Sequence, residues 1–85
     1  MDAATRQEVQ KRLRRIEGQV RGVSKMLDEG RECREVLQQL AAIRSAVQQA
    51  SISVARSYAC ECLADPTRKQ DALVDELLSV FGKAG

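Results

Sequence analysis

The sequence predicts an all-α protein, and three observations support this fold class. Apolar residues recur at alternating steps of three and four residues, which is the spacing of one face of a helix. The 85 residues include one proline and five glycines, too few for a chain rich in turns and strands. With one Tyr, one Phe and no Trp, the core must consist of small aliphatic side chains. We therefore expect a single helical domain over residues 1–85, small enough to need association with other copies.

The first predicted helix spans about residues 5–29. Thr5 and Glu8 have the spacing of a capping box, so Thr5 is the expected N-cap. Gly30 is the expected stop, because glycine commonly terminates helices. The apolar stripe of this helix consists of Val9, Leu13, Ile16, Val20, Val23 and Leu27.

The second and third predicted helices span about residues 32–64 and 66–81. No Gly or Pro interrupts residues 32–64, and so long a helix needs a partner along its length. Asp65 is the expected N-cap of the third helix, with Pro66 at its first position and Gly82 as its stop. The apolar positions are Val36, Leu40, Ile43, Val47, Ala50 and Val54, then Leu73, Val74, Leu77, Leu78 and Phe81.

Cys33 and Cys62 are 29 residues apart in the second predicted helix. At about 100° and 1.5 Å per residue, they share one face but lie roughly 43 Å apart. They can meet across an antiparallel partner helix, which indicates an intersubunit site; the alternative is that both are small core residues. The helix dipole stabilises a thiolate at the N-terminus, so Cys33 is the expected nucleophile and Cys62 the resolving thiol.

Cys60 lies about 200° from Cys62 around the helix, so the two are not expected to chelate a metal jointly. We expect Cys60 to be a bystander or a secondary thiol. Tyr58 shares the face of Cys62, and tyrosine is a poor ligand for Cu(I) or Zn(II). The sequence contains no histidine. No cofactor is therefore expected, and the alternative is a linear Cu(I) site on the thiolates of Cys33 and Cys62.

The first predicted helix carries the basic excess of a chain whose net charge is only +2. Residues 1–31 hold eight Lys or Arg against five Asp or Glu. On a helical wheel the basic side chains fall opposite the apolar stripe, with Gly18 and Gly22 among them. One interpretation is contact with DNA phosphates, which the glycines would admit closely. The other is a solvated face whose glycines serve helix packing. The basic side chains are Lys11, Arg14, Arg15, Arg21 and Lys25.

Several functional classes are disfavoured by composition. The sequence has no apolar signal region and no run of transmembrane length, so no membrane association is expected. Three cysteines cannot form a closed disulfide framework, which favours a reduced, cytoplasmic setting. Without histidine or a recognisable acid–base constellation, an enzyme is not expected.

The run Arg12-Leu-Arg-Arg-Ile-Glu-Gly-Gln-Val-Arg-Gly22, followed by Cys33 and Cys62, resembles the copper-sensitive operon repressor (CsoR) family over nearly the whole chain. The resemblance implies a disc-shaped homotetramer, made of two antiparallel dimers, that releases operator DNA on binding its effector. It also implies DNA contacts from the first helix. These contacts carry over onto Arg12, Arg14, Arg15 and Arg21.

Copper sensors of that family use a Cys, a His and a Cys at the positions that Cys33, Tyr58 and Cys62 occupy here. Because the histidine is missing, the chain is more similar to the persulfide-sensing branch, in which reactive sulfur species bridge cysteines of adjacent subunits. We therefore expect a DNA-binding repressor that senses persulfides or polysulfides through Cys33 and the Cys62 of a neighbour. The alternatives are a Cu(I) sensor using this pair, with Cys60 assisting, and a helical interaction module without a DNA role.

Overall fold

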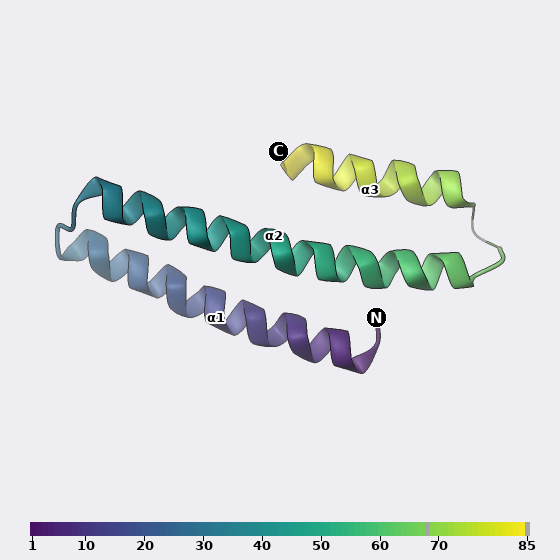
Figure 1. Ribbon diagram of the computed structural model, residues 1–85, viewed down its shortest axis with the longest axis horizontal. Helices are drawn as coiled ribbons and strands as arrows, with labels where there is room; N and C mark the ends of the chain where they lie inside the picture. The colour runs from purple at the N-terminus through teal and green to yellow at the C-terminus, as the bar shows by residue number, and fades with distance from the viewer. Residues whose placement is uncertain (68, 85) are drawn as a thin grey trace.

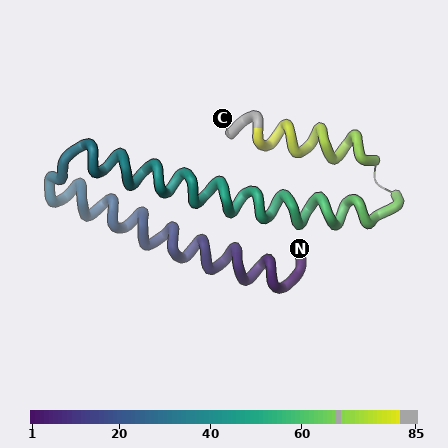
Figure 2. Tube along the Cα trace, in the orientation of Figure 1, coloured from purple at the N-terminus to yellow at the C-terminus, as the bar shows by residue number. Residues whose placement is uncertain are grey.

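The computed structural model describes residues 1–67 and 69–84, which form three α-helices and no strand. The helices are α1 (Ala3–Asp28), α2 (Cys33–Ala64) and α3 (Gln70–Ala84). α1 and α2 form an antiparallel hairpin, and α3 folds back along the C-terminal half of α2, on the side away from α1 (Figures 1 and 2). The prediction of an all-α fold is confirmed.

The N-terminus of α1 lies two residues earlier than predicted. Asp2 is the N-cap, with an extended backbone (φ −70°, ψ 162°), and the Arg6 N–H donates to the Asp2 carbonyl at 3.0 Å. The prediction that Thr5 caps the helix is therefore wrong, because Thr5 lies inside the first turn. Interaction with the nearby Thr5 side chain is the main cause that lowers the pKa of Asp2.

Gly30 ends the first helix as predicted. Its φ of +69° is left-handed, a conformation that glycine adopts without strain. The Gly30 N–H donates to the Leu27 carbonyl at 3.1 Å, and the Arg31 N–H donates to the Met26 carbonyl at 3.0 Å. This pair of hydrogen bonds is a Schellman motif, which satisfies the last carbonyls of α1 and turns the chain directly into α2.

The connection between α2 and α3 differs from the prediction. Asp65 is the C-cap of α2, and its Oδ1 accepts hydrogen bonds from the Thr67 backbone N–H at 2.9 Å and the Thr67 hydroxyl at 2.7 Å. The Asp65 carboxylate thus stabilises a turn instead of capping a helix at Pro66, and α3 begins only at Gln70. The predicted stop at Gly82 is also wrong, because α3 continues to Ala84.

The described chain is flat and leaves much apolar surface uncovered. Its extents are 55 × 27 × 13 Å, and its radius of gyration is 16.7 Å, whereas a compact domain of this length has a radius of gyration of about 12 Å. In α1 the predicted stripe divides into two parts. Val9, Ile16 and Val23 are buried against α2, whereas Leu13, Val20 and Leu27 are 46% to 62% exposed.

None of the described helices is long and apolar enough to cross a membrane. Exposed apolar side chains of this kind suit contact with another folded surface.

Candidate functional site

The two predicted sensing thiols lie at opposite ends of α2. Cys33 is the first residue of this 32-residue helix and is exposed, whereas Cys62 lies near its end and is buried. No disulfide joins cysteines within the described residues. Because α2 is unbroken, the structure confirms that one chain cannot bring these two sulfurs together.

Cys33 lies beside a network of charged side chains. The Arg31 Nε donates to Glu35 Oε2 at 2.8 Å, and the Arg31 guanidinium also lies 3.8 Å from Glu29. The hydrogen bond from Arg31 is the largest cause that lowers the pKa of the Glu35 carboxyl, and Glu35 in turn raises the pKa of Arg31. Arg31 is therefore engaged by carboxylates.

Cys62 lies under α3. It borders a cavity of about 310 Å³, and the other residues that line this cavity belong to the α2–α3 connection and to α3. One helical turn before Cys62, the Tyr58 hydroxyl donates to Glu76 Oε2 at 2.6 Å and so connects α2 to α3. Tyr58, which the resemblance aligns with the histidine of the copper sensors, is therefore hydrogen-bonded to a carboxylate.

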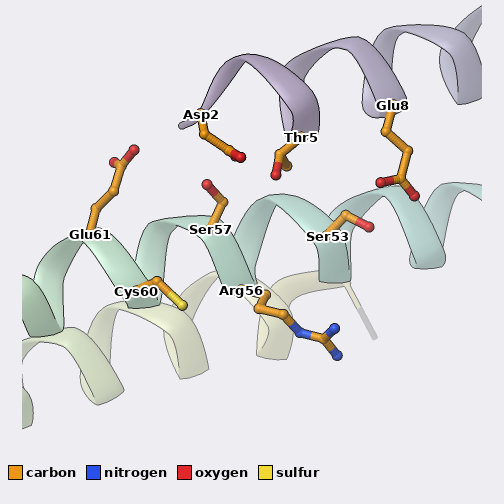
Figure 3. Close-up of a pocket in the computed structure, with 8 residues that line it drawn as sticks. All are labelled: Asp2, Thr5, Glu8, Ser53, Arg56, Ser57, Cys60 and Glu61. Atoms are coloured by element: carbon orange, nitrogen blue, oxygen red, sulfur yellow. The ribbon is translucent and has the colours of Figure 1, made fainter.

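Cys60 lies in a different environment from Cys62. It is exposed and borders a cavity of about 470 Å³ between the start of α1 and the C-terminal half of α2. In Figure 3, Ser57 lies toward Asp2 and Thr5 of α1, whereas Arg56 points away from α1. The described residues contain no group of three or more His, Cys, Asp or Glu side chains that could hold a metal ion. Cys60 and Cys62 border different cavities, on different sides of α2.

The predicted DNA-contact residues fall into two groups. Arg14, Arg15 and Arg21 are exposed and make no hydrogen bond or ion pair with the described residues. Arg12 is half-buried instead, and its guanidinium donates to Gln49 of α2 at 2.9 Å and to Glu8 at 3.3 Å. The Arg12 Nε is buried without a hydrogen-bond partner among the described residues. Arg12 therefore contributes to the α1–α2 contact, and the other three present free cationic groups.

Gly18 and Gly22 leave a bare strip of backbone among these arginines. A Cβ built on either glycine would meet no atom of the described residues within 4 Å. Packing of α1 on α2 therefore does not require glycine at these positions. The strip is available to a surface outside the chain.

Two contacts were not identified from the sequence, namely Arg12–Gln49 and Tyr58–Glu76. Both join residues of different helices, 37 and 18 positions apart. No local pattern indicates such pairs, since each depends on how one helix is aligned along another.

Comparison with known proteins gives consistent results. The family described as "Metal-sensitive transcriptional repressor" matches residues 5–83. The copper-sensing transcriptional repressor CsoR of Bacillus subtilis is 36% identical over 78 residues, covering 89% of this chain and 77% of the relative. The transcriptional repressor RcnR of Salmonella typhimurium is 40% identical over 79 residues, covering 89% and 87%. The structure of a single-residue variant of the formaldehyde-responsive regulator FrmR from Salmonella enterica serovar Typhimurium superposes with a TM-score of 0.76 at 25% identity, covering 98% and 96%.

Proposed function

The chain belongs to the metal-sensitive transcriptional repressor family, and we propose that its effector is a persulfide or polysulfide, which cross-links Cys33 to Cys62 of a neighbouring subunit. As a member of this family it is a repressor and not an enzyme. We further propose that the protein acts in the cytoplasm and that its cross-linked form releases operator DNA.

The observation that carries this proposal is the set of residues along α2. Two thiols lie 29 residues apart, and no histidine lies between them. By the resemblance, Tyr58 stands where the copper sensors hold a histidine. The Tyr58 hydroxyl is already hydrogen-bonded to Glu76, and a phenol is a poor ligand for a soft metal. Two thiolates without a third soft ligand suit sulfur exchange better than a three-coordinate copper site.

The proposed site requires a second subunit. In an antiparallel dimer the start of one α2 lies beside the end of another, so that Cys33 of one chain approaches Cys62 of its neighbour. The exposed side chains of Leu13, Val20 and Leu27 supply apolar surface for association. We propose a homotetramer formed from two such dimers.

The effector alone supplies the two-electron oxidant that formation of the disulfide requires. The Cys33 thiolate attacks a sulfane sulfur and forms a new S–S bond, while an S–S bond of the polysulfide breaks and the shortened polysulfide leaves as an anion. The neighbour's Cys62 thiolate then attacks Cys33 Sγ, which forms the disulfide and expels hydrosulfide. Two thiolates lose two electrons, and the sulfane sulfur gains them. When Cys33 carries a longer sulfur chain, attack at the sulfur bonded to Cys33 Sγ leaves that sulfur in the bridge and expels the outer sulfur as hydrosulfide.

Coupling to DNA follows from the packing of α1 on α2. Val9, Ile16 and Val23 bury α1 against α2, and Arg12 hydrogen-bonds to Gln49 across the same contact. A cross-link that displaces α2 therefore displaces α1 and the arginines that it presents. Phosphate contacts require matched spacing of cations, so such a displacement weakens binding.

The test measures DNA binding and covalent state together. The probe is a fluorescent duplex from the region upstream of the protein's own gene, titrated before and after treatment with sodium tetrasulfide. Treated wild type should lose affinity and show a covalent dimer by intact mass spectrometry. Cys60→Ala should behave as wild type, whereas Cys33→Ala should stay bound and uncross-linked. Release of DNA by treated Cys33→Ala would contradict the proposal.

The second candidate is a Cu(I) sensor, because the 36% identical relative from Bacillus subtilis is copper-sensing. Cys33 and the neighbour's Cys62 would supply two thiolates, and Cys60 would have to turn toward them. Cys60 is exposed whereas Cys62 is buried, which argues against its assistance. Anaerobic Cu(I) titration against a chelator separates the two functions. Tight binding of one Cu(I) per subunit with loss of DNA affinity would favour copper.

A further inference from the structure

The two proposed sensing thiols differ in their accessibility. Cys33 is exposed, whereas only 6% of Cys62 is exposed. The shielding comes from the chain that follows Cys62, because the connection to α3 and α3 itself form the opposite wall of its cavity. The position of α3 therefore controls how readily a reagent reaches Cys62. The residues of that wall are Thr67, Lys69, Ala72, Leu73 and Glu76.

The Tyr58–Glu76 hydrogen bond closes the α2–α3 contact next to this thiol. Tyr58 lies one turn before Cys62 on α2, and Glu76 lies three residues after the buried Leu73 on α3. The 2.6 Å distance between the Tyr58 hydroxyl and Glu76 Oε2 is typical of a hydroxyl bound to a carboxylate. Such charge-assisted hydrogen bonds are stronger than neutral ones.

α3 packs less extensively than α1 in the described chain. It packs on α2 and not on α1. Leu77 and Phe81 border an apolar cavity of about 480 Å³ whose other walls include Val9 and Leu13 of α1. Helices with few buried contacts open locally at low free-energy cost. Loss of one strong contact should therefore change how often α3 leaves Cys62.

We propose that Tyr58 and Glu76 are positioning residues for the sensing reaction: their hydrogen bond holds α3 over Cys62, so that Cys33 reacts first and Cys62 reacts after α3 moves away. This inference rests on the proposed sulfur-sensing function, because only that function requires Cys33 to react before Cys62. It explains how an incoming polysulfide is directed to the nucleophile, while the resolving thiol stays protected from oxidants and premature modification.

The test measures alkylation of each thiol and does not involve sulfur chemistry. Reduced full-length protein, in a Cys60→Ser background, is treated with iodoacetamide, quenched over time and analysed by peptide mass spectrometry. Cys62 is then the single thiol of the tryptic peptide spanning residues 57–68. We expect Cys62 to react at least about tenfold more slowly than Cys33, because reaction at Cys62 requires local opening.

Substitutions of the latch, meaning the Tyr58–Glu76 hydrogen bond, should affect Cys62 alone. Tyr58→Phe and Glu76→Ala should each raise the Cys62 rate about five- to tenfold, as expected for loss of one solvent-exposed hydrogen bond. Glu76→Gln should raise it less, because the amide oxygen still accepts from Tyr58. The matched control is Asp75→Asn, since Asp75 is an exposed neighbouring carboxylate on α3 without a described hydrogen bond or ion pair. Neither Asp75→Asn nor any latch variant should change the Cys33 rate.

Three outcomes would contradict the proposed role of the latch. The Cys62 alkylation rate could be unchanged in Tyr58→Phe and Glu76→Ala, or it could rise equally in Asp75→Asn. The third outcome is an equal rise of the Cys33 alkylation rate in the latch variants. Sodium tetrasulfide treatment of the same proteins tests the proposed function separately. Faster cross-linking in Tyr58→Phe than in wild type supports both proposals. A wild type that shows the expected alkylation rates but never cross-links would overturn the sulfur-sensing function and leave the latch standing.

Discussion

The Arg12 guanidinium donates a hydrogen bond of 2.9 Å to the Gln49 side chain, and this contact ties α1 to the middle of α2. Arg12 begins the basic run on which the family resemblance rests. The arginines that follow it at positions 14, 15 and 21 are exposed instead. A residue that sequence assigns to DNA contact therefore also has a structural role, and the two roles can be separated by measurement.

Arg12→Ala should destabilise the protein, whereas Arg21→Ala should not. Loss of the Arg12 hydrogen bonds should lower the free energy of unfolding by about 1 kcal/mol, and an exposed substitution should change it by less than about 0.5 kcal/mol. Arg21→Ala should weaken DNA binding and reduce the salt slope by about one unit. Urea denaturation and DNA titrations at several salt concentrations check both. Equal stability of the two variants would contradict the assignment for Arg12.

Gly18→Ala should stabilise the helix and weaken DNA binding. Alanine favours a helix interior over glycine by up to about 1 kcal/mol, and an added Cβ meets no described atom within 4 Å. A surface that approaches this bare backbone closely would be held away by the methyl group. Thermal unfolding at fixed protein concentration and DNA titration are the measurements. A more stable variant with unchanged DNA affinity would show that DNA does not approach at Gly18.

Stability should decline at acid pH partly through Glu35. Arg31 lowers the pKa of the Glu35 carboxyl below 4.5, its ordinary value. The stabilisation is therefore fully present above that value and is lost as pH falls through the lower pKa of the folded state. Arg31, whose already high pKa is raised further, adds no pH dependence near neutrality. The melting temperature of Glu35→Gln should thus fall less than that of wild type between about pH 5 and pH 3. Parallel curves would contradict a role for this pair.

Val20→Asp should disrupt the assembly. Val20 is 48% exposed in the single chain, so an aspartate there leaves the α1–α2 contact intact but introduces a charge on the apolar surface proposed for association. Light scattering with size exclusion should give a tetramer mass for wild type and a smaller mass for the variant. Arg15→Asp, which changes an exposed basic position, should keep the wild-type mass. A tetrameric Val20→Asp would exclude this stripe from the interface.

The fold could be predicted because helical patterns are local. The apolar spacing of α1 and the uninterrupted run of α2 indicated both helices, and Gly30 marked the turn where its left-handed φ is needed. The prediction failed where a short polar side chain could accept hydrogen bonds in either of two local backbone conformations. Asp65 can cap a helix or stabilise a turn, and in the structure it accepts two hydrogen bonds from Thr67. The start of α1 also differs from the prediction, because the helical backbone already begins after Asp2 and not after Thr5.

The sequence by itself determined that Cys33 and Cys62 lie at opposite ends of one helix, because an unbroken helix fixes the separation of its residues through local hydrogen bonds. Only the tertiary structure decided that Cys62 is covered while Cys33 is exposed, and that Arg12 is held against α2. It also paired Tyr58 with Glu76. These features depend on how α1 and α3 are aligned along α2, and that alignment arises from contacts between residues far apart in the chain.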